Sequence, residues 1–598
     1  MPEDNKKEEI AGAPEIIPGA ELKPAVKTEV TPKDDEKLEE AVDDIAVRDS
    51  DELLNSEDEK LGEAFIPKDR TFKQKVRDFL REWWQNPKKR WGTIIGLVVL
   101  ILVIGTVPTT RYFVLNTVGV RSSASVTILD ESTGQPLKNV SVTVGSAEGK
   151  TNDSGTAKLQ KIKLGSTKLV IQKRAFATID RTIVIGLGSN PLGEMKVKPV
   201  GVQYSFDVKD FLSDKPIEKA EASVGEFSAF SNVDGRAVLT IDDPNNTLDI
   251  TIKATGYRDE TITQNTDSKD VQVTKMVPSR KHVFVSKRSG KYDVYKIDVD
   301  GKNESLVLSG TGNEREDIAL VSHPDKDLTA LVSTRDSARN RDGYLLSTLT
   351  ILDVGGADAG TISLGRSEQF QVVGWSGDQL VYVQIADGAS ASNPKRHRLI
   401  TYNYKTHESK ELASSNYFND VVLVGGDIYY APSAAFQQDP KVGLMKVSAT
   451  GDNQKTLFDK EVWNIFRTDY NTLTFSVQSD WYQYSIIDGK TISANGPPSV
   501  QLTRVYHDGP ERKRSLWIDQ RDGKGVLLAY NVDDKSDAIV RSQSGLTYPA
   551  RWLTANAVVY RINTDQESAD YVINLDGGDS KKIVDVTNTS SLDRWYYY

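Results

Sequence analysis

The sequence of 598 residues contains no cysteine and only five histidines. The absence of cysteine excludes disulfide bonds, thiolate zinc or iron–sulfur sites, and a cysteine nucleophile. The histidines are scattered over positions 282, 323, 397, 407 and 507, and no HExxH or HxH pair occurs. The usual sequence signatures of a histidine metal site are therefore missing. We expect no metal and no cofactor.

Signatures of other chemistries are also missing. The string nearest to a GxSxG nucleophile elbow is GWSGD at Gly374–Asp378, which departs from that spacing, and neither a phosphate-binding loop nor a nucleic-acid motif occurs. Asp298, Asp300 and Gly301 resemble the start of an EF-hand loop, but the glutamate at its twelfth position is absent and Asp-Gly favours a hairpin turn. The sequence thus predicts no catalytic, cofactor-binding or metal-binding residue, no nucleic-acid partner, and a protein that is not an enzyme.

The net charge of −10 is unevenly distributed along the chain. Residues 1–66 hold 21 acids against 8 bases, and residues 67–90 hold 3 acids against 9 bases, which leaves about −3 for the other residues. The first segment is rich in Glu, Asp, Lys and Pro and poor in aromatic residues, so it cannot bury enough surface to offset chain entropy. The sequence predicts a disordered acidic tail over residues 1–66.

Residues 91–110 contain no charged residue, and Ile94–Ile104 consists of aliphatic residues and one glycine. Twenty helical residues rise by about 30 Å, the thickness of the hydrocarbon core of a bilayer. Nine basic residues precede this run, whereas only Arg111 and Arg121 follow it closely. The positive-inside bias then leaves the N-terminus in the cytoplasm and exports the C-terminal domains, extracellular or periplasmic. The sequence predicts a single transmembrane helix over residues 91–110 in the plasma membrane.

Residues 67–90 have the pattern of an amphipathic helix whose opposite face is basic. This pattern favours a basic juxtamembrane helix over 67–90 that lies on anionic lipid, with packing on a partner protein as the alternative. The apolar residues of its one face are Phe72, Val76, Phe79, Leu80, Trp83 and Trp84.

An internal repeat follows the apolar run. PLKNVSVTVG at 136–145 matches PIEKAEASVG at 216–225, and NDSG at 152–155 matches NVDG at 232–235, both at an offset of 80. Alternating apolar and polar residues between glycine and proline turns predict two β-sandwich domains, over residues 120–200 and 201–278. The motif order resembles the carboxypeptidase-regulatory-like and PEGA domains of bacterial surface proteins. This resemblance implies spacers or binding platforms.

Residues 279–598 show a longer repeat of strand, polar turn and strand. A propeller blade of four strands needs about 40–50 residues, so the repeat predicts a β-propeller over 279–598 with seven blades, six or eight remaining open. The Tyr-x-x-Asp-x-Asp-Gly hairpin that ends at Gly301 resembles TolB-type repeats. The hairpin turns fall near Asp298, Asp353, Tyr404, Ala449, Asp488, Asp533 and Asp576, which are 55, 51, 45, 39, 45 and 43 residues apart.

The aliphatic strand before each hairpin, such as HVFVSKR at 282–288, is expected to be an inner strand of its blade. The first blade has no obvious strand before His282. We therefore expect Arg594–Tyr598 to complete that blade and close the ring.

The predicted fold class is mainly β: a disordered tail, a single transmembrane helix, two β-sandwich domains and a β-propeller. The predicted function is that of a non-enzymatic, single-pass protein of the cell envelope. Its exported propeller, raised on the two sandwich modules, would bind an envelope protein or a cell-wall polymer. Alternatives are a propeller enzyme acting on envelope glycans and a transmembrane signalling protein. The expected partners are the lipid bilayer, that envelope component and a cytoplasmic partner of the acidic tail.

Two basic clusters, Lys395–Arg398 and Arg512–Arg514, are open to two interpretations. They could contact an anionic polymer or lipid headgroups, or they could be solvated loop charges.

Overall fold

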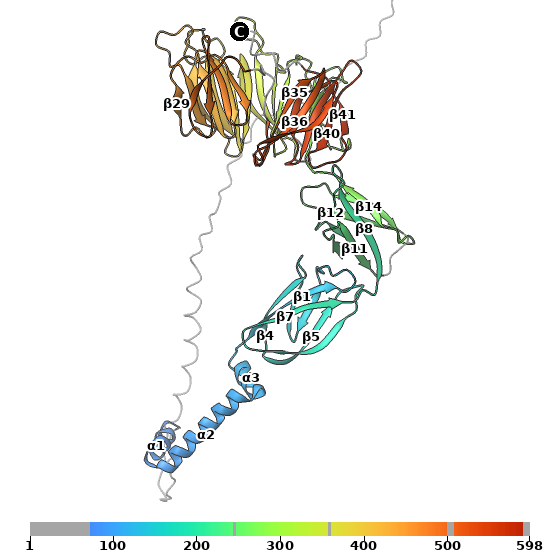
Figure 1. Ribbon diagram of the computed structural model, residues 1–598. Coiled ribbons are helices and arrows are strands. Elements are labelled where there is room, and N and C mark those ends of the chain that lie inside the picture. The colour runs from blue at the N-terminus through green and yellow to red at the C-terminus, as the bar shows by residue number, and fades with distance from the viewer. Residues whose placement is uncertain (1–71, 243–246, 357–359, 499–506, 590–598) are drawn as a thin grey trace, which may run out of the picture. The chain divides into compact units, whose positions relative to one another are not determined.

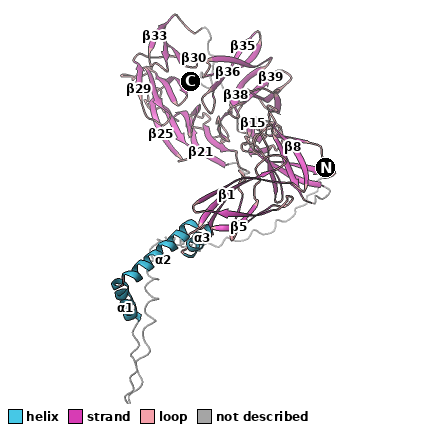
Figure 2. Ribbon diagram, turned by 60° about the horizontal axis from the view of Figure 1, so that its bottom comes forward, coloured by secondary structure: helices cyan, strands magenta, loops and turns pink. Residues whose placement is uncertain are grey.

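The structure, a computed structural model, describes residues 72–242, 247–356, 360–498 and 507–589 (Figure 1). The predicted acidic tail over 1–66 and the predicted closing strand Arg594–Tyr598 lie outside the described residues. The described chain is mainly β, with helices only near its start (Figure 2).

The three helices are α1 (Phe72–Gln85), α2 (Pro87–Thr106) and α3 (Pro108–Thr117). Proline has no N–H to donate and clashes with the preceding turn, so it begins a helix but does not continue one. This corrects two predictions: the juxtamembrane helix ends at Gln85 instead of residue 90, and the helix expected over 91–110 is broken at Val107. No single described helix is long and apolar enough to cross a bilayer; Pro87–Val103 and Pro108–Thr117, bent by 98°, meet that test only together.

The chain after α3 forms a domain of two sheets around one apolar core, which we call module 1. The three-stranded sheet has the order β4-β1-β7, and the four-stranded sheet has the order β3-β2-β5-β6. Side chains of both sheets, among them Ile128, Leu159 and Ile171, share the core. The strands are β1 (Ser122–Asp130), β2 (Ser141–Val144), β3 (Ala147–Lys150), β4 (Thr156–Ile162), β5 (Gly165–Gln172), β6 (Ile179–Ile185) and β7 (Ser189–Val197).

The next seven strands repeat this arrangement in module 2. Their sheets have the orders β11-β8-β14 and β10-β9-β12-β13, which are those of module 1 shifted by seven strands. The strands are β8 (Val202–Asp210), β9 (Glu221–Val224), β10 (Phe227–Phe230), β11 (Arg236–Ile241), β12 (Thr247–Lys253), β13 (Glu260–Asn265) and β14 (Gln272–Met276).

The repeat extends to single turns 80 residues apart. Gly155 and Gly235 have positive φ angles of 69° and 76°. A Cβ atom on either glycine would lie 2.6 or 2.5 Å from the carbonyl oxygen of Ile128 or Val208. Only glycine fits a turn that combines this backbone conformation with such a close approach.

Seven consecutive sheets make up residues 282–585 and follow one another around a common centre, as in a β-propeller (Figure 2). Blade 1 is β15 (His282–Ser286), β16 (Asp293–Ile297) and β17 (Ser305–Leu308). Blade 2 is β18 (Ala319–Ser322), β19 (Leu328–Ser333), β20 (Ser347–Asp353) and β21 (Gly360–Ser367). Blade 3 is β22 (Gln369–Ser376), β23 (Gln379–Ile385), β24 (His397–Asn403) and β25 (Glu408–Ser415). Blade 4 is β26 (Phe418–Val424), β27 (Asp427–Pro432), β28 (Leu444–Ser448) and β29 (Lys455–Phe458).

The other three blades have the same antiparallel order. Blade 5 is β30 (Ile465–Asp469), β31 (Thr472–Val477), β32 (Asp480–Ser485) and β33 (Thr491–Ala494). Blade 6 is β34 (His507–Asp508), β35 (Arg514–Arg521), β36 (Lys524–Asn531) and β37 (Ser536–Gln543). Blade 7 is β38 (Leu546–Trp552), β39 (Ala557–Asn563), β40 (Ser568–Asn574) and β41 (Lys581–Asp585). The predicted β-propeller is thus confirmed.

The aliphatic strands that the sequence predicts to be inner strands are not the innermost ones. The strands nearest the axis are β18, β22, β26, β30, β34 and β38; β26 and β30, for example, are joined where the Ile465 N–H donates to the Asp420 carboxylate at 2.8 Å. In blades 2 to 7 the predicted aliphatic strands, β19 among them, lie second, whereas β15 is the first described strand of the three-stranded blade 1. The second strand is buried on both faces and is therefore continuously apolar, whereas β18 is only half-buried along its length.

Blade 1 meets the end of the described chain. The backbone N–H of Thr587 donates to the carbonyl of Val285 at 3.1 Å, and the Thr587 hydroxyl accepts a hydrogen bond from the Lys287 N–H at 2.8 Å. Phe284 and Val299 of blade 1 pack with Val559 of blade 7 in one apolar cluster. The chain after β41 therefore runs beside β15, at the edge that lacks an innermost strand.

Candidate functional site

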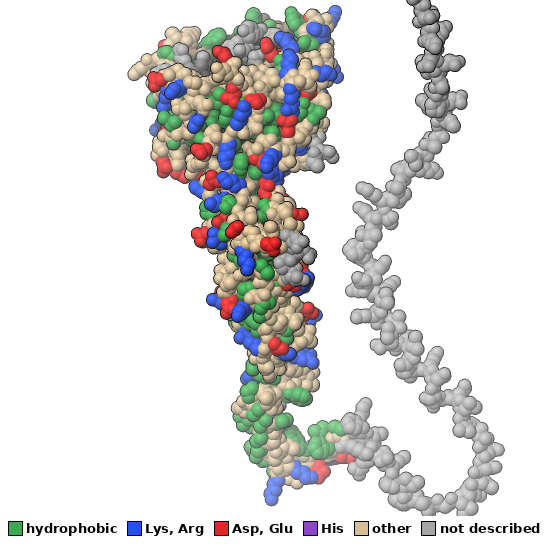
Figure 3. All heavy atoms as spheres, turned by 90° about the vertical axis from the view of Figure 1, so that its right-hand side faces the viewer, with side chains coloured by type: hydrophobic (Ala, Val, Ile, Leu, Met, Phe, Trp, Pro, Cys, Tyr) green, Lys and Arg blue, Asp and Glu red, His purple; other side chains and the backbone are tan. Residues whose placement is uncertain are grey.

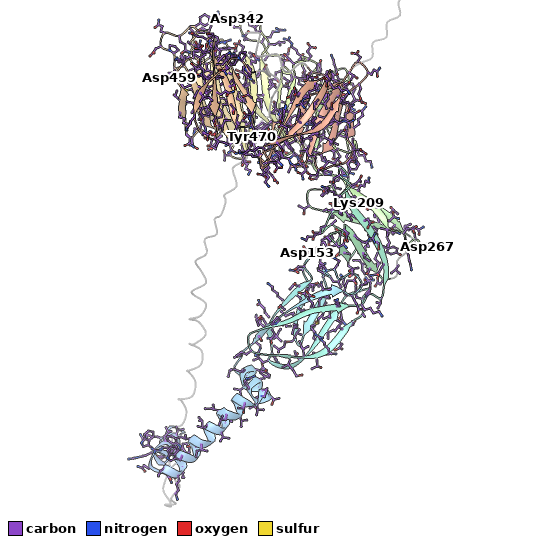
Figure 4. All side chains as sticks on the ribbon, in the orientation of Figure 1. Asp153, Lys209, Asp267, Asp342, Asp459 and Tyr470 are labelled. Carbon is purple, nitrogen blue, oxygen red and sulfur yellow. The ribbon has the colours of Figure 1, made fainter. Side chains whose placement is uncertain are left out.

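Long loops gather on one face of the propeller, which we call the upper face. It carries the loops between the second and third strands of the blades and the connections between blades; the lower face carries the other turns. Asp342 lies at the upper face and Tyr470 at the lower (Figure 4). The loops of blades 2, 3 and 4 span residues 334–346, 386–396 and 433–443, whereas those of blades 5 and 6 have only two residues each.

Among the described residues of this face, three aromatic side chains are prominently exposed. Tyr344 in the blade 2 loop is 62% exposed, Phe436 in the blade 4 loop is 77% exposed, and Trp463 in the connection at 459–464 is 46% exposed. Large exposed aromatic side chains anchor many protein interfaces, because each buries much surface at a low cost in conformational entropy. We call Tyr344, Phe436 and Trp463 the aromatic trio.

A buried amide and a carboxylate brace the segments that carry Phe436 and Trp463. The Asn416 amide, 1% exposed, donates to the Ala391 carbonyl at 3.0 Å and to the Ala435 carbonyl, and so joins the loops of blades 3 and 4. Glu461 accepts the Ala434 N–H at 2.7 Å, which ties the connection that carries Trp463 to the loop that carries Phe436. Loops held in this way lose little conformational freedom when they bind a partner.

The formal charge of the three long upper loops, those of blades 2, 3 and 4, is balanced. Arg339, Arg341, Lys395 and Lys441 are exposed beside the exposed acids Asp336, Asp342, Asp387 and Asp439. The charge on these three loops therefore favours neither an anionic nor a cationic partner, and the aromatic trio is the distinguishing feature of the described upper face.

The two predicted basic clusters are largely paired within the protein. His397 is buried, Arg396 lies 3.4 Å from the Glu368 carboxylate, and Arg398 lies 2.7 Å from Glu411. In the second cluster, Lys513 contacts Glu511 at 3.1 Å and Arg514 contacts Asp576 at 3.2 Å.

Carboxylates near the axis are also bound by protein groups. The described innermost strands hold three acids, Asp420, Asp469 and Asp508. Asp420 accepts hydrogen bonds from the backbone N–H groups of Val421 and Ile465, both at 2.8 Å. Burial raises the pKa of its carboxyl to about 6. Asp508 accepts a hydrogen bond from Arg467 at 3.0 Å.

A buried polar network joins blades 7, 1 and 2, and we call it the ring latch. His282 Nε2 lies 3.0 Å from Asp570 Oδ2, and the Arg561 guanidinium donates to the same carboxylate at 2.8 and 3.1 Å. Arg551 donates to His282 Nδ1, to the Val283 carbonyl at 2.8 Å and to the Ser322 hydroxyl. Because Nδ1 accepts a hydrogen bond from Arg551, the neutral ring carries its proton on Nε2, and this N–H donates a hydrogen bond to Asp570.

The electrostatics of the ring latch favour this neutral ring. Burial, helped by the charge of Arg551, lowers the pKa of His282 to about 4. Burial alone would raise the pKa of Asp570, but the hydrogen bond from His282 and the charge of Arg561 outweigh it and hold that pKa well below its usual range. The latch therefore contains one buried carboxylate between two guanidinium ions, an arrangement that stabilises the ring junction rather than activating a nucleophile.

The residues that the sequence analysis weighed for chemistry have structural partners. In the GWSGD string, the Trp375 indole donates to the Val321 carbonyl at 2.9 Å, and Ser376 is the last residue of β22, before a lower-face turn. Asp298 is fully buried and accepts hydrogen bonds from Arg258 of module 2 at 2.6 Å and from Lys281. Within the described ranges, no group of three His, Asp or Glu side chains could hold a metal ion.

Sequence and structure comparisons give contrasting results. No protein-family model matches the chain, and no curated protein matches it. Among solved structures, TolB from Acinetobacter baumannii is 11% identical, with 52% of this chain and 80% of that one covered and a TM-score of 0.29. An oligogalacturonate lyase is 12% identical, with 50% and 86% covered and a TM-score of 0.32. The tricorn protease is 12% identical, with 77% and 52% covered and a TM-score of 0.30.

These neighbours contradict the prediction that the protein is not an enzyme. A lyase and a protease are among the structures that this chain resembles, so the prediction, which relied on missing motifs, was wrong. At these identities the likeness concerns the fold alone and assigns no activity to this chain.

Proposed function

We propose that this chain is a membrane-anchored protein of the cell envelope whose propeller binds another envelope component through its upper face. The proposal rests above all on the aromatic trio, which is exposed on one face of the ring and whose members Phe436 and Trp463 lie on braced segments. When a partner covers exposed apolar side chains of this kind, binding is favoured by about 25 cal/mol for each Å² of apolar surface removed from water.

The anchor is supported by the surface of α2. Its apolar side chains are exposed on every side of the helix, where water would solvate them poorly. Hydrophobic side chains gather over the helical part of the chain (Figure 3). The exposed residues are Trp91, Ile94, Ile95, Leu97, Val98, Val99, Leu100, Ile101, Leu102 and Val103. We therefore propose that the lipid bilayer covers the apolar side chains of α2, with the basic residues of α1 on the cytoplasmic side; α2 has the length and hydropathy of a span only together with α3, which follows it after Val107.

The absence of cysteine makes the proposed topology directly testable. A Tyr344→Cys variant of the full chain should react with a membrane-impermeant maleimide on intact cells, because Tyr344 is exposed on the exported propeller. A Ser56→Cys variant should react only after lysis. Labelling of Ser56→Cys, but not of Tyr344→Cys, on intact cells would reverse the proposed orientation.

A further inference from the structure

The end of module 1 that receives α3 has an unusual surface. Four large apolar side chains are strongly exposed there: Phe113 of α3 at 72%, Val118 at 69%, Leu187 at 67% and Val184 at 64%. The segments 107–123, 161–166 and 184–190 that form this end contain four exposed basic residues and no acid. We call this end the α3 surface, and its bases are Arg111, Arg121, Lys161 and Lys163.

Helix α3 is fixed to module 1 by one asparagine. The Asn116 amide donates to the Leu164 carbonyl at 2.9 Å, and its oxygen accepts the Leu164 N–H, also at 2.9 Å. This reciprocal pair joins α3 to the turn between β4 and β5. Phe113 is consequently exposed on a helix that cannot turn it inward without breaking two hydrogen bonds.

The loop that carries Leu187 is rigid as well. Asn190 accepts the Gly186 N–H at 2.8 Å and donates to the carbonyls of Gly186 and Gly188 at 3.1 and 3.2 Å. Ser122, which follows α3 by four residues, donates to the Gly186 carbonyl at 2.8 Å. Leu187 is therefore exposed because these hydrogen bonds fix the backbone of its loop, and not because the loop is flexible.

The position of this surface in the chain indicates what covers it. Only Val107 separates α3 from α2, and one extended residue spans at most about 3.6 Å. If α2 crosses the bilayer, α3 lies within one residue of the membrane surface. Exposed apolar side chains among bases, without acids, are the composition that inserts between anionic headgroups.

We propose that the α3 surface lies on the lipid headgroups of the leaflet from which α2 emerges, with Phe113 and Leu187 inserted among them. This inference rests on the proposed membrane anchor. Module 1 then contacts the bilayer directly and is not connected to it through α2 alone.

Lipid quenching of a fluorescent probe tests this placement in the full chain. Single-cysteine variants Val99→Cys, Leu187→Cys and Val233→Cys are labelled with NBD and reconstituted in vesicles of phosphatidylcholine and phosphatidylglycerol. Val233 is the matched control, because it is 70% exposed but lies in a turn of module 2. Spin-labelled lipids should quench the probes at positions 99 and 187 at least twofold more than the probe at position 233.

The other outcomes separate the two proposals. Quenching at position 99 without quenching at 187 overturns the headgroup contact and leaves the anchor intact, and no quenching at either position overturns the anchor itself. A blue-shifted but unquenched probe at 187 shows that protein covers the surface, which also overturns the inference. Adding Phe113→Ser to the Leu187→Cys variant should reduce its quenching, while the probe at position 99 in the same background stays quenched.

Discussion

Replacing Asp570 with alanine is expected to lower the melting temperature of the propeller by about 5–10 °C. The carboxylate is 2% exposed and is the only acid of the ring latch, so its removal leaves the guanidinium groups of Arg551 and Arg561 buried without a counter-ion. Breaking a buried ion pair from one side costs about 3–5 kcal/mol. Each kcal/mol lowers the melting temperature of a large domain by about 2 °C.

Two further variants show whether the charge of Asp570 is responsible. Asp570→Asn keeps an acceptor for His282 and should lose less stability than Asp570→Ala. Asp576→Ala, in the turn after β40, removes a half-exposed partner of Arg514 and should cost less than about 1 kcal/mol. Thermal unfolding of the full chain, with hydrogen exchange of β15 and β40, reports the changes. Equal melting temperatures for Asp570→Ala and Asp576→Ala would refute the stabilising role of the ring latch.

Replacing Gly525 with alanine should destabilise the propeller by about 3 kcal/mol. Gly525 lies on β36, and a Cβ atom there would lie 2.0 Å from the backbone oxygen of Leu546 on β38. A backbone atom cannot rotate away as a side chain can, so blades 6 and 7 must move apart and lose part of their shared core, which includes Leu527 and Tyr560.

Gly360 is the matched control for this substitution. A Cβ atom on Gly360 of β21 would meet only the Asp353 Cβ, at an ordinary 3.5 Å. Gly360→Ala should therefore leave stability within about 0.5 kcal/mol or raise it slightly. Denaturant unfolding of both variants measures the difference, and a Gly525→Ala protein as stable as Gly360→Ala would mean that the two blades are not in close contact.

The propeller could be predicted because its outer hairpins carry local signals. Asp-Gly and Asn-rich turns between alternating strands recur at the length of a blade, and the seven hairpins correspond to the last two strands of the seven sheets. The innermost strands escaped prediction because they are short and half-buried, as in β18, or interrupted by polar residues such as Asp420. Burial on both faces, not position at the axis, produces the strongest aliphatic pattern.

The ring latch and the aromatic trio could not be predicted, because the residues of the latch are distant in sequence and those of the trio follow no pattern. His282 and Asp570 are 288 residues apart and meet only because the ring closes. Phe436 lies in an irregular loop, where sequence patterns do not distinguish a buried from an exposed aromatic residue. The helix break at Val107 could have been predicted from the sequence, because Pro108 lies inside the predicted 91–110 span and signals a helix boundary.

Site-specific photo-cross-linking in intact cells tests most directly whether the upper face binds an envelope partner. A benzoylphenylalanine replaces Phe436 on the upper face or, as the matched control, Ile487, which is 72% exposed in a lower-face turn of blade 5. The account predicts a discrete cross-linked product from position 436 that disappears when Tyr344 and Trp463 are changed to serine, and no product from position 487. Equal products from both positions, or a product from position 487 alone, would contradict it.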